Sequence, residues 1–441
     1  MERGHIEQIQ KQKLGCLLDA VSTANPFYRQ KLSSGSGVSP TPRASQRDQE
    51  RPLVELLDEL PLTTKTELER DQLESPPYGT NLTFEPARYS RLHQTSGTTG
   101  KPLRWLDTPQ SWSWILNCWD EVYQGVGLQR DDRVLFPFSF GPFLGFWSGF
   151  EAASRRSSFI VPAGGLTTLA RLRLIETHAV TVVVCTPTYA LHMAEVAAAE
   201  GVDLPGSSVR ELIVAGEPGG NVATTKERIE EGWGARCFDH CGMTEIGAYG
   251  FERDETRGNL HVIESEFIVE VLKPGGTERV GDGNEGELVL TNLGRTGSPL
   301  LRYRTGDLVR WTTDPGPGGV YGRLLGGILS RLDDMIIVRG NNVYPSAIED
   351  VVRAFREVAE YRVVVGRSAA LAELVVEIEP VAVRGAGQDC IPQLVQRVRE
   401  GLERRLLFRV DVRAVASGVL PRFELKGKRM IREEPDEPSS S

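Results

Sequence analysis

Cysteine is sparse in this sequence, and long apolar runs are missing from it. Six cysteines are dispersed through 441 residues, unlike the dense cysteine framework of a small disulfide-stabilised domain. The apolar stretch at residues 180–185 is far shorter than the roughly 20 residues that a membrane-spanning helix requires. The opening residues, MERGHIEQIQ, are charged and lack the apolar centre of a secretion signal. We therefore expect a cytoplasmic protein with no membrane partner.

Positive charge is not concentrated anywhere either. The formal net charge is -9, the isoelectric point is near 5.5, and lysine and arginine are scattered along the chain. A surface for binding polyanions is disfavoured, so nucleic acid is not an expected partner, although a local basic pocket is compatible with this composition. The sequence also lacks internal repeats and coiled-coil heptads.

The length and the spacing of β-rich segments predict an α/β protein of two unequal domains. A chain of 441 residues exceeds what one compact core usually spans. Short β-rich segments are separated by lengths that hold helices, which is typical of parallel sheets. These segments are 133–136, 159–161, 180–185 and 211–215. From Phe267 the strands FIVEVLK and GELVLT follow more closely, which predicts an antiparallel region appended to the parallel part.

A smaller αβ unit is expected after Arg331. Apolar residues recur there at helical spacing in two places, around Ile348 and around Leu394, and the strands RVVVG and ELVVEIE lie between them. We expect a large domain at 1–331 and a small domain at 332–441. Residues 33–52 and the tail PDEPSSS are rich in serine, proline and charge, which predicts mobile segments.

Residues 95–102, TSGTTGKP, have the composition of a phosphate-binding loop. Glycines allow successive backbone amides to turn toward an anion, and the hydroxyls of Ser96, Thr98 and Thr99 with the amine of Lys101 would complete the site. Only two residues separate Gly97 from Gly100, so the segment does not match the Walker pattern. A polar surface turn is the plainer alternative.

Four later segments carry further polar groups. In DHCGMTE, Asp239 can accept from an exocyclic amine, Thr244 can donate to a phosphate and Glu245 can hold magnesium. In YRTGD, Asp307 can accept from two sugar hydroxyls, although a solvated turn is the plainer reading. SRLDDMIIVRGNNVYP places Arg331 and Asp333 at the expected domain boundary, where a charged turn is typical of a hinge. PRFELKGKR is a basic run, which by default is a solvated tail.

Together, in this order, the five segments resemble the adenylate-forming superfamily of acyl-CoA synthetases, adenylation domains and luciferases. Within it the sequence is most similar to the phenylacetate-CoA ligase family. That similarity rests on NPFYRQKL at 25–32, TPTYA at 186–190, AGEPG at 215–219 and LPRFELK near the end.

The resemblance implies a two-step reaction with ATP, magnesium and, as the acceptor, coenzyme A. A carboxylic acid would attack the α-phosphorus of ATP to give an acyl-adenylate, which a thiol then takes. The family positions imply that the following residues act: Ser96, Thr98, Thr99 and Lys101 on the β and γ phosphates; Thr244 and Glu245 on phosphate and magnesium; Gly216, Glu217, Asp239, His240 and Cys241 around nucleotide and acid; Asp307 with Arg331 on the ribose; Lys426 on the α-phosphate; and Asp333 as the hinge.

Some positions leave alternatives open. Cys241 stands where the family usually has a tyrosine that stacks on adenine, and a thiol offers less stacking area. Lys428 is a second candidate for the role of Lys426, which the family spacing favours. Cys237, Cys241, His240 and His261 invite a zinc hypothesis, although packing is the more common role of cysteine. His93 is either a structural histidine or a wall of the active site.

The aromatic stretch at 136–147, FPFSFGPFLGFW, suggests an acid that is aryl, arylacetic or otherwise apolar. Core packing is the alternative for most of its rings. Other functions also remain open: loading of a carrier protein or an amine, a nucleotide-binding regulatory protein with a degenerate site, and a Walker-type phosphotransferase. A homodimer is possible.

Overall fold

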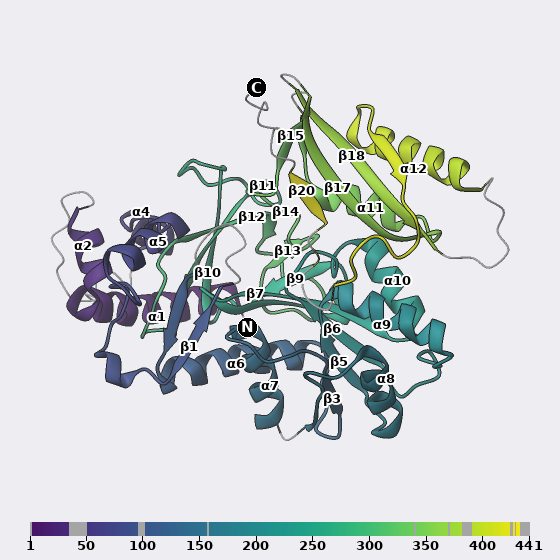
Figure 1. Cartoon of the computed structure of the whole chain (residues 1–441). Helices are drawn as coiled ribbons and strands as arrows, with labels where there is room; N and C mark the ends of the chain where they lie inside the picture. The colour runs from purple at the N-terminus through teal and green to yellow at the C-terminus, as the bar shows by residue number, and fades with distance from the viewer. Residues whose placement is uncertain are drawn as a thin grey trace.

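The computed structural model describes residues 2–34, 51–95, 102–156, 158–338, 341–368, 371–381, 390–423, 427 and 429–432. They form a large α/β domain and a smaller C-terminal αβ domain, which lies above it in Figure 1. The expected fold class is confirmed. The predicted mobile loop at 33–52 falls mostly outside the described residues, and the tail PDEPSSS falls wholly outside them.

Five parallel strands build one half of the central sheet, in the order β4-β3-β5-β6-β7. The strands are β3 (Arg133–Phe136), β4 (Phe159–Pro162), β5 (Val182–Cys185), β6 (Glu211–Ala215) and β7 (Arg236–Met243). The helices of this half are α6 (Pro109–Gly125), α7 (Leu144–Arg155), α8 (Thr168–Thr177), α9 (Pro187–Glu200) and α10 (Ala223–Trp233). The predicted β-rich segments are thus confirmed as strands of a parallel sheet.

Helices cover both faces of this parallel half. In β3, Val134 and Phe136 belong to a core shared with α6 and α7, whereas Leu135 belongs to a second core shared with α8, α9 and α10. Successive side chains of a strand point to opposite faces of the sheet, and on each face they contact the apolar side of a helix. This explains why these strands are apolar throughout and do not alternate with polar residues.

An antiparallel half continues the same sheet, in the order β10-β11-β12-β13-β9-β8 up to β7. Its strands are β8 (Gly247–Glu252), β9 (Asn259–Val262), β10 (Phe267–Leu272), β11 (Glu285–Asn292), β12 (Tyr303–Thr312), β13 (Arg323–Leu325) and β14 (Ser330–Arg331), which pairs with β12. The expected strands FIVEVLK and GELVLT are β10 and β11. The antiparallel region is therefore continuous with the parallel one.

The N-terminal segments flank this sheet. They are α1 (Arg3–Ala24), α2 (Pro26–Ser34), α4 (Leu53–Asp58), α5 (Lys65–Glu74), the single turn η1 (Pro86–Arg88), and the hairpin of β1 (Arg91–Gln94) and β2 (Arg104–Asp107). A second single turn, η2 (Asp254–Thr256), lies between β8 and β9. One side of α1 is buried, and Leu14, Leu17 and Val21 lie on it. Among the described helices none is long and apolar enough to cross a membrane.

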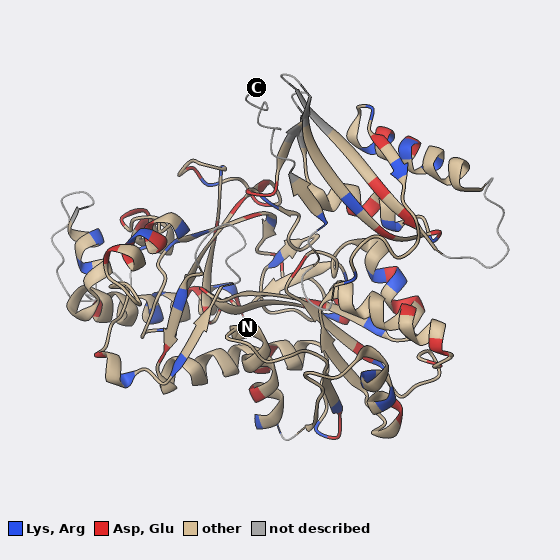
Figure 2. Cartoon of the chain, in the orientation of Figure 1, with Lys and Arg blue, Asp and Glu red and all other residues tan. Residues whose placement is uncertain are grey.

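The small domain has a core of its own. Its elements are β15 (Ile336–Val338), β16 (Asn341–Val343), α11 (Pro345–Arg353), β17 (Val358–Ser368), β18 (Leu371–Pro380), α12 (Cys390–Leu406), β19 (Asp411–Ala414) and β20 (Met430–Arg432). Four strands form a sheet in the order β19-β18-β17-β20, and α11 lies against α10 of the large domain (Figure 1). The chain leaves the large sheet at Arg331 and enters the small domain at Ile336. Both charge signs are interspersed over the two domains in Figure 2, as the scattered lysines and arginines suggested.

Candidate active site

The β1–β2 hairpin holds the base of the predicted phosphate loop. The Thr95 amide donates to the Leu103 carbonyl over 3.0 Å, and the Leu103 amide donates to the Thr95 hydroxyl over 3.0 Å. The Gln94 amide donates to the Pro142 carbonyl over 2.7 Å, which ties the hairpin to the aromatic loop before α7. The predicted phosphate ligands Ser96, Thr98, Thr99 and Lys101 lie outside the described residues.

A buried arginine links this hairpin to the β7–β8 turn. Arg295 donates to both carboxylate oxygens of Asp107, at 2.7 and 2.6 Å, and to the carbonyls of Thr244 and Glu245, at 2.6 and 3.1 Å. Burial acts to raise the pKa of Asp107, but Arg295 holds that pKa below its ordinary value. No local motif marks Arg295, so the sequence alone did not indicate its role. A buried charge that satisfies two separate segments is visible only in three dimensions.

His93 belongs to this structural network. Its ring stacks on Trp112 with centroids 5.1 Å apart, and its Nδ1 lies 3.6 Å from Asp107. The side chain is almost completely buried. Of the two roles considered for His93, the contacts support the structural one.

Asp239 and His240 lie inside β7 and point in opposite directions. Asp239 accepts from the side-chain amide of Asn221, and burial together with the charge of Glu252 raises the pKa of Asp239 to about 7. The His240 ring lies 4.3 Å from Trp119, and its Nδ1 is 2.7 Å from the Gly250 carbonyl. Burial lowers the pKa of His240 to about 4, so the imidazole is neutral near pH 7.

Cys241 faces the neighbouring strand β8. A Cβ atom added at Gly250 would lie only 2.4 Å from the Cys241 sulfur, so the thiol occupies the space that this glycine leaves. Burial raises the pKa of the Cys241 thiol well above its ordinary value. The thiol is therefore neutral, packed and short of room for a larger side chain.

Asp307 and Arg331 are paired across β12 and β14. Arg331 donates to Asp307 over 2.9 Å, and Asp333 lies 3.6 Å from Arg331 with its side chain 74% exposed. Burial raises the pKa of Asp307 to about 6, although Arg331 opposes the shift. Glu245 is also buried, and its charge acts on both Asp307 and Tyr303. Three of the five predicted segments therefore meet at one place.

The loop after β6 receives the C-terminal segment. Glu217 accepts from the Thr188 amide over 2.8 Å and from the Gly427 amide over 2.6 Å. Thr188 is in the first turn of α9, where amides have no partner within the helix. Gly216, in the same loop, has a φ of 95°, which favours glycine. Lys426 itself lies outside the described residues, but its neighbour Gly427 is bound to Glu217, another of the predicted site residues.

The aromatic stretch forms a cluster beside the β1–β2 hairpin. Phe138 stacks on Phe146 with centroids 4.2 Å apart, and Phe140 lies 4.7 Å from Trp147. Phe136 is fully buried in the core, whereas Phe140, Phe146 and Trp147 are only partly buried. Phe136 therefore fits the core alternative, whereas Phe140, Phe146 and Trp147 keep part of their surface outside the core.

No group of three or more metal-binding side chains occurs within the part of the chain that the structure describes. His261 is bound on both ring nitrogens, at 2.6 Å to Thr256 and 3.2 Å to the Tyr321 carbonyl. Cys237 and Cys241 belong to two different hydrophobic clusters. The described residues give no support to the zinc hypothesis.

Residues 35–294 match the family described as AMP-binding enzyme, and residues 340–433 match the AMP-binding enzyme C-terminal domain. The chain belongs to the AMP-binding enzyme family. Phenylacetate-coenzyme A ligase of Thermus thermophilus is 30% identical to it, over 93% of this chain and 92% of that protein. Phenylacetate-coenzyme A ligase of Escherichia coli is 29% identical, over 97% and 94%. The resemblance seen in the sequence is confirmed, and this AMP-binding enzyme is an AMP-forming acid–thiol ligase.

Crystal structures of 2-hydroxyisobutyryl-CoA ligase also resemble this AMP-binding enzyme. The postadenylation state with 2-HIB-AMP has a TM-score of 0.90 at 28% identity, covering 98% of this chain and 90% of that chain. The thioesterification state has a TM-score of 0.71 at 29% identity, covering 98% and 91%. Since one protein supplies both structures, the difference reflects how its parts are placed. By TM-score, the domain arrangement of this chain is more similar to the postadenylation state than to the thioesterification state.

Proposed function

We propose that this protein activates an aryl or arylacetic acid with ATP and magnesium and then transfers the acyl group to coenzyme A. The observation that carries the proposal is the binding of Gly427 to Glu217, which brings the C-terminal segment to the loop beside β7. Glu245, Asp307 and Arg331 converge in the same domain. The phenylacetate-CoA ligases to which the chain is similar support the acceptor and the acid class.

In the first step an acid oxygen attacks the α-phosphorus and pyrophosphate leaves. Negative charge gathers on the α-phosphate, and we assign its stabilisation to Lys426. Ser96, Thr98, Thr99 and Lys101 would bind the β and γ phosphates. The buried carboxylate of Asp307 would accept from the ribose hydroxyls, with Arg331 holding its orientation. Asp239, beside Gly220 and Asn221, would accept from the adenine amine, with Gly216, His240 and Cys241 as neighbours.

The residues present fit a magnesium ion that is only partly held by protein. Glu245 offers a buried carboxylate, and Thr244 offers a hydroxyl in the same turn. Magnesium commonly keeps several waters and binds through one or two carboxylates plus substrate phosphates. The lack of a three-residue metal cluster in the described chain is compatible with that mode. Bound there, the ion would offset charge on the departing pyrophosphate.

The aromatic cluster favours an aryl acid. Phe140, Phe146 and Trp147 are partly buried beside the hairpin that carries the phosphate loop. Aromatic rings prefer edge or offset contacts with one another, so a substrate ring would find matching partners there. The 2-hydroxyisobutyryl-CoA ligase shows that an aliphatic acid is the alternative within similar structures.

We also propose that the boundary between the two domains lies between residues 331 and 332, and that Asp333 belongs to the hinge. β14 is still paired with the large sheet at Arg331, and the small domain starts at Ile336. Asp333 is exposed in the connection between them. A rotation there would allow one site to shield the adenylate and later admit a thiol.

A carrier-protein thiol is a second candidate acceptor. An L-proline--[L-prolyl-carrier protein] ligase of Pseudomonas fluorescens is 32% identical over 36% of this chain. The rate of AMP release from a preformed aryl-adenylate would be measured with coenzyme A, with a carrier protein and with hydroxylamine, and the three rates would be compared. Acceleration by coenzyme A alone supports the first proposal, and acceleration by the carrier alone contradicts it.

Pyrophosphate release tests the proposal directly. The protein would be given ATP, magnesium and a panel of aryl and aliphatic acids, with Lys426→Ala and the neighbouring Lys428→Ala as paired variants. We expect aryl acids to give the fastest release, Lys426→Ala to lose at least about a hundredfold, and Lys428→Ala to keep most of the rate. Failure of every acid would contradict the proposed activation, and loss in Lys428→Ala alone would reassign the catalytic lysine.

A further inference from the structure

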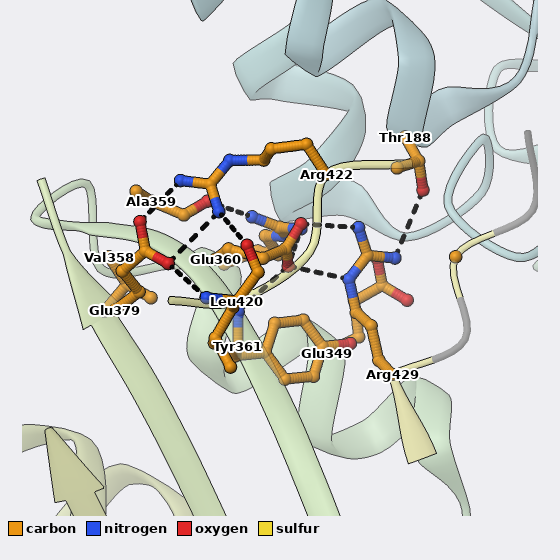
Figure 3. Close-up of polar contacts among 12 residues, drawn as sticks. Thr188, Glu349, Val358, Ala359, Glu360, Tyr361, Glu379, Leu420, Arg422 and Arg429 are labelled. Carbon is orange, nitrogen blue, oxygen red and sulfur yellow. Dashed lines mark hydrogen bonds and ion pairs between the residues drawn. The ribbon is translucent and has the colours of Figure 1, made fainter. Parts of the chain in front are cut away.

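Arg429 connects the small domain to the large one. Its guanidinium donates twice to Glu360 of β17, at 2.8 and 3.1 Å, and once to the hydroxyl of Thr188 on α9, at 3.1 Å. Figure 3 shows the guanidinium between the two domains, with Thr188 on one side and Glu360 on the other. The side chain of Arg429 is 10% exposed. It is therefore fixed from its own domain and directed at the other.

The small-domain end of this connection is rigid. Glu360 also accepts from Arg353 over 2.9 Å and from the Tyr361 amide over 2.9 Å. Burial acts to raise the pKa of Glu360, but Arg353 and Arg429 together hold that pKa below its ordinary value. A carboxylate that accepts from two arginines and one amide has little freedom to turn. The position of Arg429 is thus set before the domains meet.

A second connection crosses the same boundary two residues away. Glu217 accepts from the Gly427 amide with one oxygen and from the Thr188 amide with the other. Thr188 therefore accepts from Arg429 with its hydroxyl and donates to Glu217 with its amide. A Cβ atom added at Gly427 would lie 2.6 Å from Arg429 Nη1 and 3.3 Å from the Thr188 hydroxyl, so the three groups pack closely.

Two ion pairs between the domains are looser or more exposed than the contacts around Thr188. Arg356 pairs with Glu231 at side-chain exposures of 76% and 53%. Arg422 approaches Glu195 only to 3.6 Å, and its closer partner is Glu379 in its own domain. The contacts around Thr188 are the ones that fix the segment next to residue 426.

We propose that Arg429 and Glu217 are positioning residues for adenylation, acting through Thr188 and Gly427 to place the segment that contains Lys426. In this role both residues act through the chain segment and not on the reacting atoms. The inference rests on the proposed function, since it assumes that Lys426 serves the first half-reaction. Because the contacts cross the domain boundary, they must break when the small domain turns, so they favour adenylation and do not support thioester formation.

The two half-reactions of Thr188 variants test this inference. Thr188→Val removes the hydroxyl and keeps the shape and the backbone amide, whereas Thr188→Ser keeps the hydroxyl. With phenylacetate as the probe acid, we expect Thr188→Val to slow single-turnover pyrophosphate release roughly tenfold, since a hydrogen bond to a charged group is lost. Thr188→Ser should recover most of that rate. With phenylacetyl-adenylate and coenzyme A, thioester formation by Thr188→Val should equal or exceed that of the parent.

Arg356→Gln is the matched control, because it removes an exposed contact between the same two domains. It should leave both half-reactions within about twofold. Equal slowing of both half-reactions in Thr188→Val, or no slowing of either, overturns the inference. Absence of acid-dependent pyrophosphate release in the parent protein overturns the proposed function instead, so the two failures are distinguishable.

Discussion

The nucleotide side of the site and the domain boundary are held together in different ways. On the nucleotide side, Arg295 and Asp107 are both fully buried, and the arginine binds the turn that carries Glu245. At the boundary, Arg429 reaches Thr188 through one hydrogen bond, and Arg356 meets Glu231 in solvent. Buried ion pairs are costly to break, whereas exposed ones contribute little. The comparison sets a buried framework against a boundary with more exposed contacts, which is compatible with the hinge proposed at Asp333.

The largest loss of stability is expected from substitution of Arg295. Arg295→Met would leave Asp107 buried without its partner, and we expect the free energy of unfolding to fall by about 3–5 kcal/mol. Chemical denaturation would measure it. The double variant with Asp107→Leu should lose less, because no unpaired charge remains. A single variant as stable as the parent would show that the framework does not depend on this pair.

Substitution of Asp307 tests whether the buried part of the site binds the nucleotide. Asp307→Asn keeps the size but removes the charge opposite Arg331, and we expect the KM for ATP to rise by about tenfold or more. Steady-state kinetics with varied ATP would measure it. Asp314→Asn, at an exposed carboxylate near β12, is the control and should leave KM unchanged. An unchanged KM in Asp307→Asn would remove Asp307 from the proposed ribose site.

Asp239 should make the free energy of unfolding depend on pH. Its pKa is about 7 in the folded protein and about 4 when unfolded. The folded state therefore holds a proton that the unfolded state has lost in this window, and the free energy of unfolding falls as pH rises through it. Between pH 5.5 and 8 the parent should lose roughly 1–2 kcal/mol more stability than Asp239→Asn. Denaturation of both proteins at the two pH values would measure this, and parallel pH profiles would contradict the assignment.

The smallest effect is expected at the exposed part of the boundary. Arg356→Gln should change the free energy of unfolding by less than about 0.5 kcal/mol, because both partners are largely in solvent. Urea denaturation would measure it. A loss comparable to that of Arg295→Met would erase the distinction between framework and boundary.

Local sequence patterns predicted the elements well and the site in part. The apolar runs at β3, β5 and β6 and the spacing around Ile348 and Leu394 were confirmed as strands and helices. Such patterns are readable because residues close in sequence decide them. The pairing of Asp307 with Arg331 could not be predicted in this way, because it joins strands β12 and β14, which are not adjacent in the sequence. Arg295 was missed for the same reason.

The sequence by itself determined the two-domain α/β plan, the adenylate-forming family and the positions that its motifs mark. Those features depend on residue type, order and spacing, which are all present in the linear chain. Only the tertiary structure decided that His240 packs on Trp119 and that Cys241 fills the space beside Gly250. It also brought Glu217 to Gly427 and Arg429 to Thr188. Each of these contacts joins groups whose meeting depends on how whole elements pack.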